Sequence, residues 1–142
     1  MPRCRVEPDY ADVTGEVLDF LGKYLARAEE NGLALESVVC DPGFGFGKTL
    51  THNLTLLRDL EAFGALRRPM LVGLSRKNFL KLLGGSDALS ITNEMAHLWA
   101  TARGAAIWRV HDVASALKTA RLAAAFARGA DTLLPSPSTL AP

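Results

Sequence analysis

The sequence has few cysteines and no long apolar run, and each absence excludes a class of protein. Its two cysteines, Cys4 and Cys40, stand far apart and lack the spacing of a zinc site. We therefore expect reduced thiols in the cytoplasm rather than a disulfide-stabilised secreted domain. No segment approaches the about 20 apolar residues of a membrane span, and the first residues lack the apolar core of a signal peptide. The sequence thus predicts no membrane partner.

An excess of one charge is also missing. Sixteen Lys and Arg face 15 Asp and Glu, which gives a formal net charge of +1. A charge so close to zero creates no broad positive field, so nucleic acid is not expected as a partner. The chain has no His-Glu-x-x-His, Cys-x-x-Cys or carboxylate cluster, and we expect no metal held by its side chains alone. His52 is assigned to a helix N-terminus and His97 to a helix face.

The residues that are present fit one globular domain. Of the 142 residues, 49% are hydrophobic and 22% are charged, which is enough apolar material for a core. We assign residues 1–130 to this domain. Residues 131–142 contain three prolines and two serines, a composition for which we expect a disordered tail.

Apolar residues recur at helical and strand spacing and predict helices that alternate with short strands. Helices are expected at 11–31, ended by Gly32, at 54–63, ended before Pro69, then from 78 through Leu83, at 91–102 and at 113–128. Buried strands are expected at 37–40, 70–74 and 106–110. These strands begin 33 and 36 residues apart, the length of a strand–helix–strand unit. The predicted class is therefore α/β with parallel strands.

The carboxyl end of every predicted strand carries polar or charged side chains. In chain order these residues are Asp41, then Ser75, Arg76 and Lys77, then Arg109 and His111. In parallel α/β folds the ligand site lies beyond the carboxyl ends of the strands. We therefore expect one crevice that combines a carboxylate with several cationic donors.

Residues 41–49 (Asp-Pro-Gly-Phe-Gly-Phe-Gly-Lys-Thr) form a glycine-rich loop after the first predicted strand. The ending Gly-Lys-Thr is similar to a phosphate-binding loop, but Pro42 occupies the position of that motif's first glycine. A turn without any ligand is the other interpretation. Two phenylalanines that alternate with glycines favour a flat apolar wall for a ligand.

The basic residues at the two later strand ends favour an anionic ligand. Arg76 and Lys77 could be ordinary surface charges, but a cation at a helix start opposes the macrodipole, which a bound anion would offset. Arg109 and His111 lie two positions apart, so that both point to one side of a strand. This arrangement favours anion binding over a buried structural histidine.

Four segments together resemble dihydropteroate synthase. They are residues 41–48 (Asp-Pro-Gly-Phe-Gly-Phe-Gly-Lys), 52–54 (His-Asn-Leu), 71–77 (Leu-Val-Gly-Leu-Ser-Arg-Lys) and 109–113 (Arg-Val-His-Asp-Val). The similarity covers about residues 8–129 in order and spacing. It implies the carboxyl-terminal portion of a (β/α)8 TIM barrel, incomplete in this chain, and an enzyme that joins p-aminobenzoate to 6-hydroxymethyl-7,8-dihydropterin pyrophosphate in folate synthesis. Sulfonamides mimic the aminobenzoate.

The resemblance also implies roles for individual residues. Asp41 would accept paired hydrogen bonds from the pterin and Lys77 would donate to its ring. Arg109 would stack on the pterin and, with His111, hold the pyrophosphate. Ser75, which could equally cap the following helix, would take the aminobenzoate carboxylate. The implied catalytic residues are Lys77 and Arg109, and the implied substrate-binding set is Asp41, Gly45, Phe46, Gly73, Ser75, Arg76, Lys77, Arg109 and His111.

The chain departs from the family in its length and in one segment. A full barrel takes about 250 residues and eight strands, whereas three strands are predicted here. Magnesium would be bound through the substrate pyrophosphate and residues that this chain lacks. Residues 91–95 replace a small-residue pattern expected at that place. We expect a marginally stable fragment that works as a homodimer or with a complementing amino-terminal half.

Two other functions are compatible with the residues. The chain could be a catalytically incompetent partner that docks on a full-length synthase through exposed helix faces. It could also belong to a pterin-dependent methyltransferase, which shares the barrel. The motifs at 75–77 and 109–111 disfavour the methyltransferase hypothesis, because they suit aminobenzoate and pyrophosphate.

Overall fold

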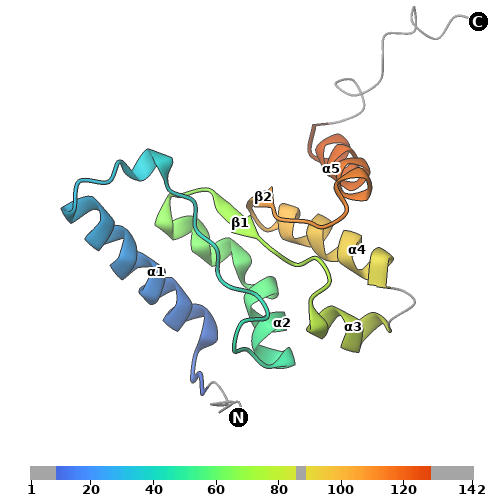
Figure 1. Ribbon diagram of the computed structural model, residues 1–142, viewed down its shortest axis with the longest axis horizontal. Helices are drawn as coiled ribbons and strands as arrows, with labels where there is room; N and C mark the ends of the chain where they lie inside the picture. Colours follow the sequence, from blue (N-terminus) through green and yellow to red (C-terminus); the bar gives the residue numbers. More distant parts are fainter. Residues whose placement is uncertain (1–8, 86–88, 129–142) are drawn as a thin grey trace, which may run out of the picture.

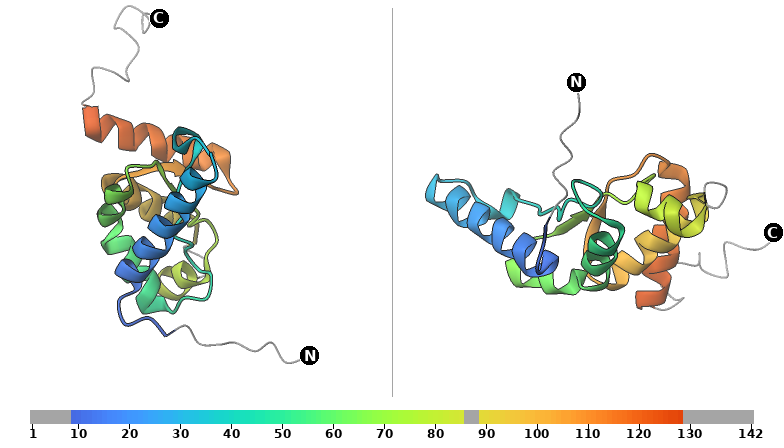
Figure 2. Two further views of the ribbon diagram at one scale, coloured as in Figure 1. Left: turned by 90° about the vertical axis from the view of Figure 1, so that its left-hand side faces the viewer. Right: turned by 90° about the horizontal axis from the view of Figure 1, so that it is seen from below.

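The computed structural model describes residues 9–85 and 89–128, so the predicted tail at 131–142 and Cys4 lie outside the described residues. Its helices surround a small parallel sheet (Figure 1). Helix α1 (Val13–Glu30) lies toward one end of the molecule, and α3 (Asn78–Gly84), α4 (Leu89–Ala102) and α5 (Val113–Arg128) lie toward the other (Figures 1 and 2). Among the described residues, no helix is long and apolar enough to cross a membrane.

The first predicted helix is confirmed as α1. Asp12 caps its start by accepting a hydrogen bond from the Gly15 N–H at 3.0 Å, as short polar N-cap residues commonly do. The helix ends at Glu30, two residues before Gly32, whose φ of +81° suits glycine. Val13 and Val17 are buried against the core.

The predicted strand at 37–40 is wrong. Residues Leu35–Ser37 form a 3-10 turn, η1, and Cys40 alone pairs with the sheet, in a parallel bridge to Met70. That bridge consists of Cys40 N–H to the Pro69 carbonyl at 3.0 Å and Leu71 N–H to the Cys40 carbonyl at 2.7 Å. Val39 is 45% exposed. An apolar run becomes a strand only where a neighbouring strand pairs with it, and just one residue has such a neighbour here.

The second predicted helix is divided into two elements. Helix α2 (Leu50–Arg58) stops at Asp59, and a 3-10 segment, η2 (Leu60–Leu66), follows. Leu60 and Phe63 are still buried, because residues three apart share one face of a 3-10 helix. His52 lies near the start of α2, where its side chain and Thr49 form a capping box, as expected from the sequence.

The two remaining strands are present but shorter than predicted. Strand β1 (Met70–Val72) pairs in parallel with β2 (Ala105–Trp108), with Val72 opposite Trp108 and a register shift after Met70. The predicted ends at 74 and 110 therefore lie beyond the strands. Pairing continues for one more bond, from the Arg109 N–H to the Val72 carbonyl at 2.9 Å. The three later helices are confirmed within a few residues of their predicted bounds; Gly129, the expected stop of α5, is not described.

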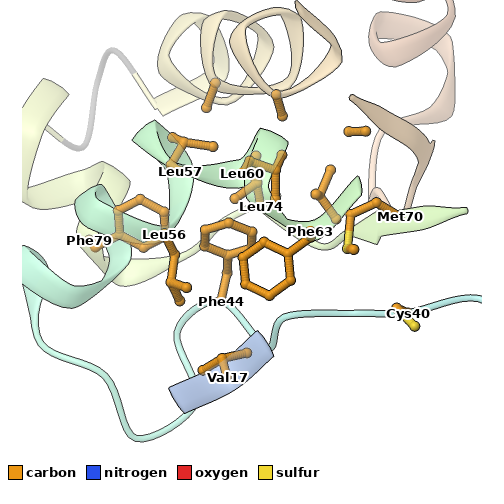
Figure 3. Packing of buried hydrophobic residues seen from close by; sticks show 14 of the residues in the cluster. Val17, Cys40, Phe44, Leu56, Leu57, Leu60, Phe63, Met70, Leu74 and Phe79 are labelled. Carbon is orange, nitrogen blue, oxygen red and sulfur yellow. The ribbon is translucent and has the colours of Figure 1, made fainter. Parts of the chain in front are cut away.

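The core lies between the helices α1, α2, α3 and α4, the segment η2 and the sheet (Figure 3). Phe44, Leu56, Phe63, Val72 and Leu74 are at most 1% exposed. Phe44 thus belongs to the core, whereas Phe46 is 64% exposed. The predicted ligand wall of two phenylalanines is wrong for Phe44, because burying this large ring anchors the glycine-rich loop to the domain.

Candidate functional site

The three loops that follow Cys40, β1 and β2 meet around one open pocket of about 550 Å³. This volume is in the range of small-molecule sites. The residues that line it are Asp41, Gly43, Phe46, Gly73, Ser75, Lys77, Arg109, Val110 and His111. Of the nine predicted substrate-binding residues, seven therefore line one pocket.

Asp41 and Arg109 form an ion pair across the pocket. The Arg109 guanidinium donates to Asp41 Oδ2 at 3.1 Å, and Asp41 Oδ1 accepts from the Gly43 N–H at 2.8 Å. The Arg109 side chain is 58% exposed and that of Asp41 27%. An ion pair this exposed contributes little to stability, so both groups remain available to a ligand.

Gly73 provides the space for Arg109. A Cβ atom at position 73 would lie 2.7 Å from an Arg109 guanidinium nitrogen and 3.1 Å from Nε. Real Cβ atoms essentially never approach so closely. The guanidinium therefore lies directly over the backbone of Gly73, which fixes where its planar face can meet a ligand.

Lys77 places its ammonium beside the exposed ring of Phe46. The Nζ atom lies 4.1 Å from the ring centroid, within the range of a cation–π contact. The Lys77 side chain also packs over Gly45, where an added Cβ would lie 2.9 Å from Cδ. Burial lowers the pKa of Lys77, nearby Arg109 lowers it further, and Asp41 opposes the shift.

Lys48 also lies close to the pocket, although the sequence analysis gave it no role. Its Nζ donates to the Gly43 carbonyl at 2.9 Å and to the Phe46 carbonyl at 3.4 Å, so it ties the glycine-rich loop together. Burial lowers the pKa of Lys48; Asp41 raises it and Lys77 lowers it. Three cations thus surround one carboxylate, and an added anion would relieve their mutual repulsion.

Ser75 and His111 contact each other across the pocket. The Ser75 Oγ lies 3.0 Å from His111 Nδ1 and 3.4 Å from the His111 backbone nitrogen, which donates to it. If the hydroxyl donates to Nδ1, Nε2 carries the ring proton and can donate to an anion. The N-cap of α3 is Lys77, so the alternative role of Ser75 as a cap is not observed.

Arg76 and Gly45 do not line this pocket. Arg76 has a left-handed backbone, with φ +59°, and lines a neighbouring cavity of about 210 Å³ together with Glu94, His97 and Asp112. Gly45 lies in the adjoining loop beneath Lys77.

Asn53 is a second residue that reasoning from side-chain patterns missed. It is 1% exposed, and its carboxamide accepts from the Gly45 N–H at 2.7 Å and donates to the Thr49 carbonyl at 2.7 Å. A buried amide that pairs with backbone groups holds the loop in one conformation. The motif His-Asn-Leu at 52–54 was the signal available in the sequence.

Magnesium has no set of side-chain ligands in the described part of the chain. No group of three or more His, Cys, Asp or Glu residues could hold a metal ion there. The residues present therefore do not fit a metal centre of their own.

Comparison with known proteins explains why these loops meet. The family described as pterin binding enzyme matches residues 2–111, which is most of the chain and includes the pocket. The chain belongs to the pterin-binding enzyme family. The third function considered from the sequence, a pterin-dependent methyltransferase, is not favoured by the relatives, which are dihydropteroate synthases.

Curated relatives agree with the resemblance seen in the sequence. The chain is 42% identical over 118 residues to the dihydropteroate synthase of Escherichia coli K12, covering 81% of this chain and 42% of that protein. It is 45% identical over 121 residues to that of Neisseria meningitidis serogroup C, covering 80% and 43%. The chain thus spans less than half the length of these relatives.

Solved structures confirm the predicted fold class. The chain is similar to the Stenotrophomonas maltophilia dihydropteroate synthase with TM-score 0.83 and 43% identity, covering 88% of this chain and 48% of that one. The Xanthomonas albilineans enzyme in complex with 7,8-dihydropteroate gives 0.83 and 37%, covering 90% and 48%. The same enzyme with 4-aminobenzoic acid gives 0.82 and 38%, covering 86% and 46%. The fold is the carboxyl-terminal portion of a (β/α)8 barrel, incomplete in this chain.

Proposed function

We propose that this chain provides the substrate-binding carboxyl-terminal part of a dihydropteroate synthase-type transferase. The reaction joins p-aminobenzoate to 6-hydroxymethyl-7,8-dihydropterin pyrophosphate in folate synthesis. The observation that carries the proposal is the meeting of Asp41, Lys77 and Arg109, from three different loops, around one pocket. A relative solved with 7,8-dihydropteroate and with 4-aminobenzoic acid supports these ligand classes.

Asp41 is the proposed pterin anchor. A carboxylate accepts two parallel hydrogen bonds, which suits the adjacent amino and ring N–H groups of a pterin. Its Oδ2 accepts from Arg109 at 3.1 Å, which keeps the guanidinium beside the proposed pterin position. There the guanidinium would stack on the pterin face, and Lys77 would donate to a ring oxygen or nitrogen.

Arg109 and His111 are the proposed pyrophosphate ligands. The bond from the pterin methylene carbon to the pyrophosphate oxygen breaks, and the electron pair leaves with the pyrophosphate. The pterin cation that forms is attacked by the aminobenzoate nitrogen, which then loses a proton. Cationic groups that are already in place stabilise the charge that develops on the leaving group.

Ser75 and Phe46 are the proposed contacts of p-aminobenzoate. The Ser75 hydroxyl would donate to its carboxylate, and the exposed Phe46 ring, with Gly45, would form one wall for the aromatic ring. Gly73 contributes space for Arg109, and Arg76 contributes positive charge from the neighbouring cavity. Holding both substrates in line supplies most of what the protein must do.

Three further expectations are part of the proposal. Magnesium would bind with the substrate pyrophosphate and residues outside this chain, since the described residues offer no ligand set. The buried free thiol of Cys40, whose pKa is raised by burial, supports action in the reducing cytoplasm. Sulfonamides would compete for the aminobenzoate contacts.

A second candidate is a catalytically incompetent partner that docks on a full-length synthase. Helix α4 favours it, because Ile91, Met95 and Trp99 recur at a spacing of four residues and are 65%, 66% and 47% exposed. A homodimer or a complementing amino-terminal half would cover the same kind of surface.

The proposal is tested by calorimetric titration of the folded chain with the pterin pyrophosphate, with magnesium present. We expect saturable binding that Asp41→Asn and Arg109→Ala each weaken by about 10- to 100-fold, because each removes a charge-assisted hydrogen bond. Arg121→Ala, an exposed arginine on α5, is the matched control and should bind like the wild type.

Two results would decide against the proposal. Binding that is unchanged in both Asp41→Asn and Arg109→Ala would show that this pocket is not the binding site. A folded chain that binds no pterin pyrophosphate at millimolar concentration, yet co-sediments with the Escherichia coli synthase, would establish the docking partner instead.

A further inference from the structure

The turn between β1 and α3 contains a residue in a strained backbone conformation. Arg76 has φ +59°, in the left-handed region that costs free energy for any residue with a Cβ atom. The turn is closed by one bond across it, from the Lys77 N–H to the Leu74 carbonyl at 3.2 Å. Such a conformation persists only where surrounding groups hold it.

Asn93 contacts the backbone of Arg76 from a different helix. Its Oδ1 accepts a hydrogen bond from the Arg76 N–H at 3.2 Å, although the two residues are 17 positions apart. Asn93 lies on α4 and is 9% exposed, so water competes little for this bond. An unsatisfied amide at that depth would be costly, which makes the pair mutually dependent.

The conformation of Arg76 decides the direction of its neighbours. With Arg76 left-handed, Ser75 and Lys77 line the substrate pocket, while Arg76 lines only the cavity beside Glu94 and His97, which Ser75 also borders. Lys77 then reaches the Phe46 ring at 4.1 Å. A turn that relaxed to the right-handed region would change the direction in which the chain leaves Arg76, and with it the place of Lys77.

We propose that Asn93 is a positioning residue for the substrate pocket. Its carboxamide holds Arg76 in the left-handed conformation and so keeps Ser75 and Lys77 directed into the pocket. The expected effect of Asn93 on substrate binding rests on the function proposed above, whereas its expected effect on the conformation of the turn does not. Asn93 touches no proposed substrate group and acts through the turn alone.

The test compares Asn93→Ala, Asn93→Asp and Arg76→Gly by NMR in the whole chain. Asn93→Ala should speed exchange of the Arg76 amide about five- to tenfold, the effect of losing one net hydrogen bond. It should also reduce the ring-current shift that Phe46 imposes on the Lys77 side-chain methylenes. Asn93→Asp keeps an acceptor oxygen at the same position and should retain both signals.

Glycine at position 76 separates positioning from general destabilisation. Glycine adopts a left-handed conformation without a steric penalty. The double variant Asn93→Ala with Arg76→Gly should therefore recover the Lys77 ring-current shift. Arg67 provides the matched control, because it is also left-handed, with φ +52°, but caps η2 away from the pocket. Arg67→Gly should not restore the signal in the Asn93→Ala chain.

The outcomes separate the two proposals. If Asn93→Ala leaves the Arg76 amide and the Lys77 shift unchanged, the positioning role is overturned whatever the chain binds. If Asn93→Ala alone fails to fold, the double variant decides, and loss of the Lys77–Phe46 contact in it overturns the role.

If the NMR changes occur but the wild-type chain binds no pterin pyrophosphate, the proposed function fails and the positioning role stands. Where it binds, Asn93→Ala should weaken affinity about tenfold. Arg76→Gly is compared only in the NMR measurements, because Arg76 itself belongs to the proposed binding set.

Discussion

At the scale of single residues, Gly73 leaves room for the side chain of Arg109. The guanidinium occupies the space of a missing Cβ atom, so the position of the cation depends on the absence of a side chain. The ion pair with Asp41 depends on the same placement, since its donor is the same guanidinium. A methyl group at this place is therefore a test of the anion site.

Gly73→Ala should weaken binding of inorganic pyrophosphate by about tenfold, the scale of one hydrogen bond to a charged group. The added Cβ would meet the guanidinium at 2.7 Å and force Arg109 away from Asp41. Gly64→Ala is a fair control, because its Cβ would meet nothing within 4 Å. Calorimetry would measure both variants, and equal affinities would contradict the role given to Gly73.

His97 is expected to make the free energy of unfolding depend on pH. It is 1% exposed, its ring lies tilted against that of Trp108 at 5.0 Å between centroids, and its ring nitrogens have no hydrogen bond of good geometry among the described residues. Burial lowers its pKa below the ordinary value of 6.5, while the Asn93 backbone and Glu94 partly oppose the shift. In the unfolded chain this imidazole therefore takes up a proton at higher pH than in the folded chain.

The free energy of unfolding should consequently fall as the pH is lowered through 6.5, and stop falling below the folded-state pKa of His97. Above that window the contribution is fully present, because His97 is neutral in both states. Urea unfolding between pH 8 and pH 5 would measure the slope. His97→Gln should flatten it, and an unchanged slope would show that other groups cause the dependence.

At the scale of elements, the glycine-rich loop is held from two directions. Lys48 bonds its carbonyls, and Asn53 on α2 bonds the Gly45 N–H from beneath. The loop is therefore an ordered part of the pocket despite three glycines with positive φ, at Gly43, Gly45 and Gly47. Its order comes from these polar contacts and from the buried ring of Phe44.

Asn53→Ala should lower the free energy of unfolding by about 1–3 kcal/mol, because it leaves the buried partners of the amide unsatisfied. It should also weaken pterin pyrophosphate binding, since the loop carrying Asp41 and Phe46 loses its support. Thr51→Ala, an exposed position on the same helix, serves as the control. Thermal unfolding of both variants would measure the difference, and an equal loss in both would refute the role of Asn53.

The sequence predicted the elements and the meeting of strand ends better than it predicted side-chain direction. Parallel strands bring their carboxyl ends together whatever their length, so Asp41, Lys77 and Arg109 could be grouped from the sequence alone. The separation of Phe44 from Phe46 could not, because a loop that alternates Gly and Phe has no helical or strand period. Contacts with the core bury Phe44, whereas Phe46 makes no such contacts and stays exposed.

Buried polar residues were the other feature beyond the reach of sequence reasoning. Asn53 and Asn93 are polar residues on helices, and in a pattern of hydrophobicity such residues read as solvent-facing. Each is buried because a backbone N–H of a distant loop needs an acceptor. That need arises only after the loop has adopted its final shape.

At the scale of the whole molecule, the residues that the structure describes leave one edge of the sheet unpaired and apolar faces of helices exposed. Cys40 contributes a single bridge at one side of β1, and Phe20 and Tyr24 on α1 are 56% and 57% exposed. Apolar faces of this kind gain stability when another polypeptide covers them. The chain spans 42% of the Escherichia coli enzyme, and the remainder of such an enzyme is a polypeptide suited to test whether these faces can be covered.

Mixing the chain with the part of the Escherichia coli synthase outside the matched 118 residues should therefore stabilise it. The midpoint of urea unfolding should rise with the logarithm of the concentration of that partner once it exceeds the dissociation constant, as mass action requires. Dihydropteroate formation from both substrates should appear in the mixture and disappear with Asp41→Asn. A mixture with an unchanged midpoint would contradict complementation.

The residues that form the pocket are far apart in the sequence, and this separation affects the order of folding. Asp41 and Arg109, which are 68 positions apart, meet only after β1 has paired with β2. Helices form in about a microsecond, whereas contacts between distant residues are slow because a long loop must close first. The pocket is accordingly among the last features to form and the first to be lost. A molecule that binds there should lengthen the lifetime of the native chain by slowing unfolding, and should leave the rate of folding nearly unchanged.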